Sequence, residues 1–85
     1  KIELHKSFLK SYVKQQIKIQ EKFKEKRNLF VEDMFHPILN NHALLGEYAG
    51  CRSINISGDI RAIFYEKSDT TTVFIAIGSH SELYK

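Results

Sequence analysis

The sequence has little of several residues that define common protein classes. Cys51 is the only cysteine among 85 residues, which excludes an internal disulfide framework and fits a reducing compartment, so we expect a cytoplasmic protein. No apolar run approaches the ~20 residues of a membrane-spanning helix, so no membrane partner is expected. No CxxC, HxxxH or HExxH spacing occurs, and the sequence therefore predicts no metal site and no cofactor.

The residues that are present indicate one globular domain over residues 1–85. Hydrophobic residues make up 42% of the chain and include six Phe and four Tyr, which is typical of a packed core rather than of disorder. A chain of this length buries about 60–65% of its extendable surface, so it has room for one modest core.

Charge is distributed unevenly along the chain. Residues 1–27 hold nine Lys or Arg and three Glu, a net charge of +6, whereas residues 28–85 hold four Lys or Arg and seven Asp or Glu, a net charge of −3. The basic first third suggests a polyanionic partner, either nucleic acid or an acidic protein segment. A solvated helix face explains the same charges equally well, so charge alone does not decide between them.

The first part of the chain has the period of two helices that follow a short strand at residues 2–4. Ser7 suits the N-cap of the first helix. Its apolar face has three- and four-residue spacing and consists of Phe8, Leu9, Tyr12, Val13 and Ile17. A lysine recurs every four residues on the other side, in a stripe of Lys6, Lys10, Lys14, Lys18 and Lys22. We expect the break between the helices near residues 18–22 and the end of the second helix at His36-Pro37, because the residue before a proline is pushed out of the helical region.

The second half has the alternating period of strands. Ile54 and Ile56 fall on one face of their strand and Asn55 on the other. Three strands are predicted at residues 52–56, 60–66 and 72–77, separated by turns at 57–59 and 67–70. The predicted fold class is α+β: a short N-terminal strand, two helices packed on one face of a small antiparallel sheet, and a short C-terminal turn or helix.

Seven polar side chains remain once the core is assigned, and we expect them to gather on the sheet face that the helices leave uncovered. They are His42, Arg52, Asn55, Asp59, Arg61, His80 and Tyr84. Arg61 is unusual, because a guanidinium inside an apolar strand is costly unless it is paired or solvated. Two interpretations stay open for it: an ion pair with Asp59 or Glu66, or a fork that binds phosphate.

Two histidines, an aspartate and an arginine on one surface suggest acid–base chemistry on a phosphodiester. One group takes the attacking proton, another protonates the leaving oxygen, and a fixed cation holds the developing charge. Histidine suits this work because its pKa lies near neutral pH, and Tyr84 could stack on a base. A single histidine is more often structural or simply exposed, and His5 and His36 are interpreted in that way.

Four stretches of the second half carry a family resemblance. They are residues 42–46 (HALLG), 50–53 (GCRS), 58–65 (GDIRAIFY) and 77–84 (IGSHSELY). Together they resemble the RelE superfamily of toxins from type II toxin–antitoxin systems, with the YafQ-like branch as the best match. The GSHSELY ending after an apolar strand is the most specific of the four.

The resemblance implies an endoribonuclease that needs no metal, cuts mRNA in the A site of the 30S ribosomal subunit, and is neutralised by a cognate antitoxin in a toxin–antitoxin hetero-oligomer. It implies acid–base roles for His42 and Asp59, a general acid in His80, a phosphate contact from Arg61 and substrate orientation by Tyr84. The further RNA contacts expected are Asn55, Arg52, Lys6, Lys10, Lys14 and Lys18.

Two positions depart from the YafQ-like pattern. Asn55 stands where that pattern has a second histidine, and Ile60 stands where it has an aromatic residue. Asparagine can hydrogen-bond RNA but cannot titrate, so acid–base work falls on the remaining groups. Two alternatives therefore stay open: a gyrase inhibitor of the ParE type, which shares the fold, and a decayed toxin that only binds its antitoxin.

Overall fold

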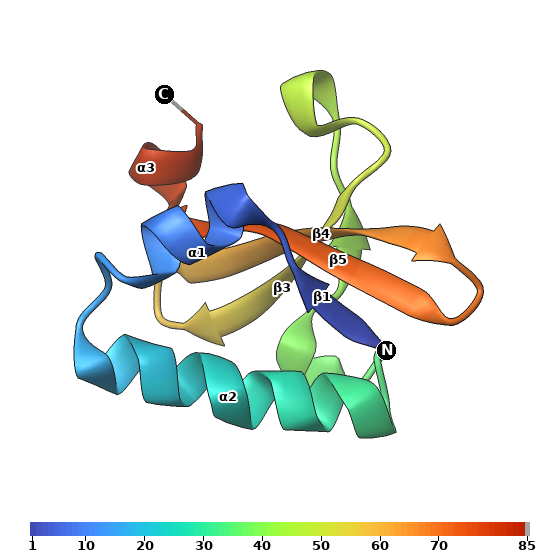
Figure 1. Ribbon diagram of the computed structural model, residues 1–85, viewed down its shortest axis with the longest axis horizontal. Helices are drawn as coiled ribbons and strands as arrows, with labels where there is room; N and C mark the ends of the chain where they lie inside the picture. Colours follow the sequence, from blue (N-terminus) through green and yellow to red (C-terminus); the bar gives the residue numbers. More distant parts are fainter. Residues whose placement is uncertain (85) are drawn as a thin grey trace.

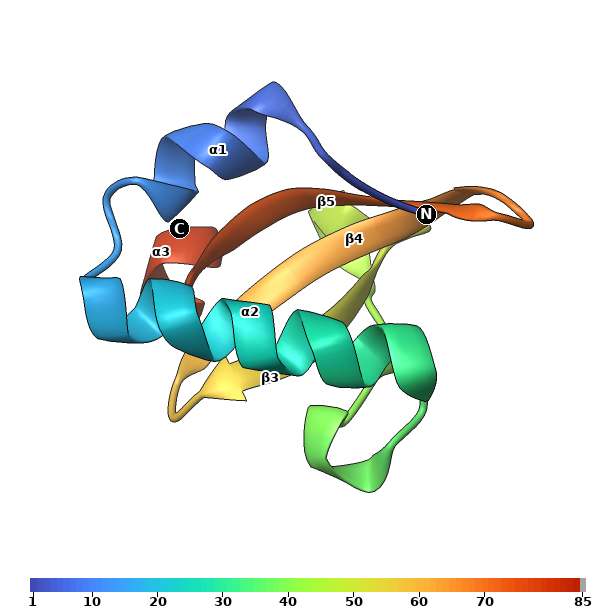
Figure 2. The same cartoon turned by 60° about the horizontal axis from the view of Figure 1, so that its bottom comes forward.

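The structure is a computed structural model that describes residues 1–84, and it has an α+β fold. In chain order the elements are β1 (Ile2–Leu4), α1 (Lys6–Tyr12), α2 (Ile17–Glu32), the 3-10 turn η1 (Pro37–Leu39), β2 (His42–Ala43), the 3-10 turn η2 (Gly46–Tyr48), β3 (Arg52–Ser57), β4 (Ile60–Ser68), β5 (Thr71–Ser79) and α3 (His80–Leu83). The strands form one sheet in the order β1-β5-β4-β3-β2. Figures 1 and 2 show α1 and α2 on the same face of this sheet, as predicted.

The sheet is mixed, so the predicted antiparallel sheet is wrong at one edge. β1 pairs with β5 in parallel, with Ile2 opposite Thr72, whereas the other neighbouring strands are antiparallel. The three predicted strands are confirmed and extend further, to Ser68 in β4 and Ser79 in β5. β1 and β2 are three and two residues long, and strands this short take their pairing from the neighbouring strand rather than from a pattern of their own.

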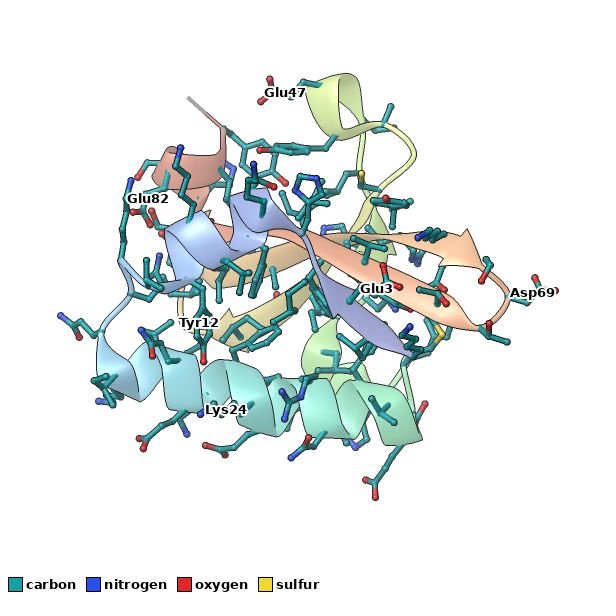
Figure 3. All side chains as sticks on the ribbon, in the orientation of Figure 1. Glu3, Tyr12, Lys24, Glu47, Asp69 and Glu82 are labelled. Atoms are coloured by element: carbon teal, nitrogen blue, oxygen red, sulfur yellow. The ribbon has the colours of Figure 1, made fainter. Side chains whose placement is uncertain are left out.

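The break between the helices lies earlier than predicted, at residues 13–16. Tyr12 ends α1, and its hydroxyl donates to the backbone carbonyl of Gln20 at 3.2 Å. The Gln20 side-chain amide donates in return to the carbonyls of Tyr12 and Gln15, each at 3.1 Å. The Gln20 side chain thus ties the end of α1 and the linker to α2, and Tyr12 lies between the two helices (Figure 3).

Both helix starts and ends differ from the predicted residues. His5, rather than Ser7, caps α1, because its Nδ1 accepts from the Ser7 backbone N–H at 3.0 Å. α2 ends at Glu32, four residues before His36, and Asp33 is extended. His36 then caps η1 by accepting from the Ile38 N–H at 3.2 Å.

The predicted lysine stripe is not continuous. Lys6 and Lys10 lie on α1, Lys14 lies in the linker between the helices, and Lys18 lies on α2. A four-residue repeat makes one stripe only along one unbroken helix. The break at residues 13–16 therefore divides these lysines among three segments.

The core is a cluster of phenylalanines between the helices and the sheet. Phe8 of α1 contacts Phe23 of α2 at 4.9 Å between ring centroids, and Phe30 of α2 contacts Phe64 of β4 at 5.0 Å. Phe74 of β5 lies 5.3 Å from Phe64 and also meets the α1 and α2 rings. Tilted and edge-on ring pairs of this kind add about 0.5–1.5 kcal/mol each to the burial of their surface. They hold both helices against one face.

β1 pairs only with residues 72–74 of β5, and α1 covers the edge of β5 that follows them. The β4–β5 register slips between Phe64 opposite Phe74 and Ile63 opposite Ala76, which leaves Ile75 as an extra residue. The Ser7 hydroxyl of α1 donates to the Ile75 carbonyl at 2.7 Å. The hydrogen bond from Ser7 thus pairs a carbonyl at the edge of β5, at the point where the β4–β5 pairing is irregular.

Candidate functional site

One end of the uncovered sheet face brings together most of the predicted site residues. Asn55 of β3 lies opposite Arg61 of β4, and Arg61 lies opposite Gly78 of β5. Side chains directly across a sheet point to the same face. Asp59 lies in the turn just before β4, and His80 follows β5 immediately. The predicted convergence is therefore found for this part of the set.

Arg61 is fixed by the hairpin turn that precedes it. Its Nη1 donates to the Gly58 carbonyl at 2.7 Å and to the Ile60 carbonyl at 3.2 Å. Gly58 has φ +52°, a conformation that favours glycine. Within residues 1–84, Arg61 forms no ion pair with Asp59 or Glu66, and Nε and Nη2 bond to no protein group. One side of the guanidinium is anchored, and the other can bind an anion in bidentate fashion.

α3 carries the exposed His80, whose ring contacts the ring of Tyr84. The two ring centroids are 4.7 Å apart, with planes tilted by 39°. A capping box starts this short helix: the Glu82 carboxylate accepts from the Ser79 N–H at 2.7 Å, and the Ser79 hydroxyl accepts from the Glu82 N–H at 3.2 Å. Leu83 is buried and anchors the helix to the core.

Gly78 has a different role from the one that its position before a turn suggests. It lies inside β5 with no positive φ. A Cβ at this position would lie 3.1 Å from Glu82 Oε1 and 3.2 Å from Glu82 Cβ. The glycine therefore permits the close approach of α3 to the end of β5.

Tyr48 is a site residue that the sequence reasoning missed. It reaches from the loop of residues 44–51, and its hydroxyl donates to the Leu83 carbonyl at 3.3 Å. Its ring meets the Tyr84 ring edge-on at 5.6 Å. Tyr48 connects the 44–51 loop with α3, and in Figure 3 the labelled Glu47 lies on this loop and the labelled Glu82 on α3. The sequence signal that could have found it is a tyrosine between two glycines, Gly46 and Gly50. In the structure both glycines adopt positive φ.

The loop that carries Tyr48 is closed on itself. The Leu44 N–H donates to the Cys51 carbonyl at 3.0 Å, and the Cys51 N–H donates to the Tyr48 carbonyl at 2.9 Å. Figure 1 shows this loop, in yellow-green, and α3, in red, projecting from the sheet away from α2. Burial raises the pKa of Tyr48 above its ordinary 10.0, and the charge of Glu47 raises it further. The hydroxyl, which is already protonated at neutral pH with the ordinary pKa, is able to donate there.

A cavity of about 250 Å³ lies between α3 and the end of α1. It is lined by Ser11, Lys14, Gln15, Tyr48, Ala76, Ile77, Glu82 and Leu83. Among the predicted RNA-binding lysines, Lys14 thus lies beside the site. Within residues 1–84, no group of three or more His, Cys, Asp or Glu side chains is arranged to hold a metal ion.

His42 is set apart from the other predicted catalytic residues. It lies on β2 opposite Ser53, and Ser53 is in line with Ile63 and Ala76. Three strand spacings, about 14 Å, separate the β2 and β5 backbones. The His42 Nδ1 pairs with the Asn40 carbonyl at 2.8 Å, and no contact within residues 1–84 joins it to His80. The predicted meeting of the two histidines is therefore wrong in the chain alone, because β4 and β3 lie between β5 and β2 in the sheet.

Arg52 lies on the opposite face from the one predicted. It is opposite Phe64 in the β3–β4 register, so it shares the core face. Its Nε donates to Asn41 Oδ1 at 2.7 Å, and its guanidinium lies 5.4 Å from the centre of the Phe35 ring. These contacts make it a tie between β3 and the loop after α2. The sequence already indicated this face, because Arg52 is two residues before Ile54 and residues two apart in a strand share a face.

Asn55 has the predicted orientation but an unusual environment. Its Oδ1 is buried and has no hydrogen-bond partner among the described residues. A buried acceptor without a partner is destabilising. The side chain is thus held beside Arg61 at a cost in stability.

Solved structures of toxins share this fold. YafQ from E. coli strain BL21(DE3) is 20% identical, with a TM-score of 0.84, and the match covers 100% of this chain and 98% of that one. YafQ in the E. coli DinJ-YafQ toxin-antitoxin complex is 21% identical, with a TM-score of 0.81 and coverage of 100% and 97%. A copper-bound mutant toxin from Helicobacter pylori is 27% identical, with a TM-score of 0.74 and coverage of 99% and 98%.

The sequence itself matches a protein family over its whole length. A search among curated proteins finds no match. The family described as "Bacterial toxin of type II toxin-antitoxin system, YafQ" matches residues 1–85. That span includes the Tyr48 loop, the Arg61 strand and the His80 ending. The chain belongs to the YafQ family of toxins from bacterial type II toxin–antitoxin systems.

Proposed function

We propose that this toxin is a ribosome-dependent endoribonuclease that cleaves mRNA in the A site of the 30S subunit. The observation that carries the proposal is the anchored guanidinium of Arg61, which is in register with Gly78 two residues before His80. A fixed cation beside an exposed imidazole is what phosphodiester cleavage by acid–base catalysis requires. The partner that would neutralise it in the cytoplasm is a cognate antitoxin, as DinJ accompanies YafQ in the E. coli complex.

The proposed reaction is an internal transfer at one phosphate. The 2′-oxygen attacks the adjacent phosphorus as Asp59 takes the hydroxyl proton. The bond from phosphorus to the 5′-oxygen breaks as His80 donates a proton to that oxygen. The products are a 2′,3′-cyclic phosphate and a free 5′-hydroxyl, and the free side of Arg61 binds the charged phosphate oxygens throughout.

The remaining polar residues would bind and orient the mRNA. Tyr84 offers a ring for base stacking, and such a contact is sequence-tolerant. His42 lies on β2, at the far edge of the same face, so it would contact a nucleotide further along the strand. Lys6, Lys10, Lys14 and Lys18 would bind ribosomal RNA, a contact that weakens as salt rises.

Expression of wild type and His80→Ala under tight control tests the proposal. Primer extension on cellular mRNA should reveal codon-phased cuts for the wild type that the variant lacks. The matched control is His36→Asn, because asparagine can keep the cap on Ile38 and the residue lies outside the site. Growth arrest by wild type without new mRNA ends would contradict the proposal, and loss of gyrase supercoiling would then favour a ParE-like activity.

A further inference from the structure

We propose that Tyr48 is a positioning residue that acts through Tyr84 to fix the His80 ring for proton transfer. The inference rests on the proposed nuclease function and extends it to a residue outside the catalytic set. Tyr48 and Leu83 are 35 positions apart in the chain, and their hydrogen bond joins the 44–51 loop to α3. The loop and the helix thereby form one unit over the uncovered face.

The contacts form a continuous series from the loop to the imidazole. The Tyr48 ring meets Tyr84 at 5.6 Å with an interplanar angle of 88°, and the Tyr84 ring meets His80 at 4.7 Å. The Tyr84 ring therefore contacts both the Tyr48 ring and the His80 ring. Edge-on and tilted ring pairs are directional contacts, so a change in the Tyr48 ring alters the orientation of the next ring.

α3 needs this support because it is short. It spans four residues, and the backbone N–H of Tyr84 closes its only turn by donating to the His80 carbonyl at 2.9 Å. Isolated helices of this length are unstable in water. The capping box holds its start, Leu83 anchors one side, and Tyr48 binds the carbonyl of Leu83 at its end. Loss of the last contact frees the end that carries Tyr84.

Tyr48 is only partly buried and lines a cavity, so it is not a residue of the packed core. Tyr48 lines the 250 Å³ cavity together with Ala76, Lys14 and Glu82. Its hydroxyl is protonated at neutral pH, since the ordinary tyrosine pKa is 10.0 and burial raises it further. It can therefore donate to the Leu83 carbonyl at neutral pH.

The test compares Tyr48→Leu, which loses both the hydroxyl and the ring, with Tyr48→Phe, which loses only the hydroxyl. Single-turnover cleavage on programmed ribosomes should fall roughly a hundredfold for Tyr48→Leu, as expected for a misplaced catalytic group, with ribosome affinity unchanged. Tyr48→Phe should lose only about fivefold, the effect of one hydrogen bond. Tyr65→Phe is the matched control, because the Tyr65 hydroxyl has no hydrogen-bond partner among the described residues.

Two further readouts separate positioning from a general loss of structure. In a His80→Ala background, Tyr48→Leu should cause little additional loss, because the two residues act as one unit. NMR of the isolated chain should show that the His80 ring resonances move in Tyr48→Leu and are nearly restored in Tyr48→Phe. An additional hundredfold loss in the His80→Ala background, or unmoved His80 resonances, would overturn the inference.

The NMR arm also separates this inference from the proposed function. If wild type cleaves no mRNA, the nuclease proposal fails, whereas a moved His80 resonance still supports the control of that ring by Tyr48. If Tyr48→Leu does not fold, Tyr48→Phe decides: faster hydrogen exchange at the Tyr84 amide than in Tyr65→Phe supports the inference, and equal rates oppose it.

Discussion

The guanidinium of Arg61 donates a 2.7 Å hydrogen bond to the carbonyl of Gly58, three residues earlier in the same hairpin. The turn thus holds a cation that has no carboxylate partner among residues 1–84. Such an arrangement is preorganised, because the charge is in position before any anion arrives. Arg61 differs in this respect from Arg52, whose guanidinium contacts Asn41 and the Phe35 ring.

Arg61→Lys should lower the rate of the cleavage step on programmed ribosomes by about 10²-fold or more, the usual cost of removing a preorganised charge stabiliser. Lysine keeps the charge, but it lacks the planar fork that can bond Gly58 and a phosphate together. Single-turnover cleavage of a ribosome-bound mRNA measures the change.

Arg52→Lys is the matched control on the opposite face. It should leave the cleavage rate unchanged and lower the unfolding midpoint, because it removes the contacts to Asn41 and Phe35. Equal losses of cleavage in the two variants would indicate that Arg61 acts only through stability.

Gly78→Ala should destabilise the protein by about 1 kcal/mol, the central cost of a point substitution. The new Cβ would lie 3.1 Å from Glu82 Oε1 and 3.2 Å from Glu82 Cβ. Glu82 cannot simply turn away, because its carboxylate bonds the Ser79 N–H in the capping box. Urea unfolding measures the cost.

A double-mutant cycle identifies the source of that cost. Glu82→Gly removes both contacting groups, so adding Gly78→Ala in that background should cost much less than it does in the wild type. A cost that is the same in both backgrounds would show that Gly78 is needed for its backbone and not for the approach of Glu82.

The features that could be predicted from the sequence have local causes. The hairpin at Gly58 follows from turn chemistry, and the orientation of Asn55 follows from alternation with its apolar neighbours. The ending from Gly78 to Tyr84 follows the end of β5 at which Gly78 lies opposite Arg61.

The features that were missed depend on contacts between distant residues. Val13 and Ile17 continue the apolar period across the break between the helices, yet they are 70% and 68% exposed, because side-chain bonds of Gln20 set the break. The separation of His42 from His80 depends on strand order, which no local pattern gives. The contacts of Tyr48 with Leu83 and Tyr84 join distant parts of the chain, so no local pattern predicts them.

Asn55→Leu should raise the free energy of unfolding by about 1 kcal/mol and lower mRNA cleavage. Leucine has a similar shape and removes a buried Oδ1 that has no partner among the described residues. Urea unfolding and single-turnover cleavage measure the two effects. A less stable variant would show that the amide oxygen is satisfied in solution, and unchanged cleavage would remove Asn55 from the RNA contacts.

The stability difference between wild type and Tyr48→Phe should shrink as pH rises above about 10. At neutral pH the wild type should be more stable by about 1 kcal/mol, because Phe cannot donate to the Leu83 carbonyl. Burial raises the pKa of Tyr48 in the folded chain. The unfolded chain therefore loses this proton first, and the stabilisation is lost as pH rises through the folded pKa. Urea unfolding of both proteins between pH 8 and 11 measures the difference, and a gap that stays constant would mean that the hydroxyl is not buried against α3.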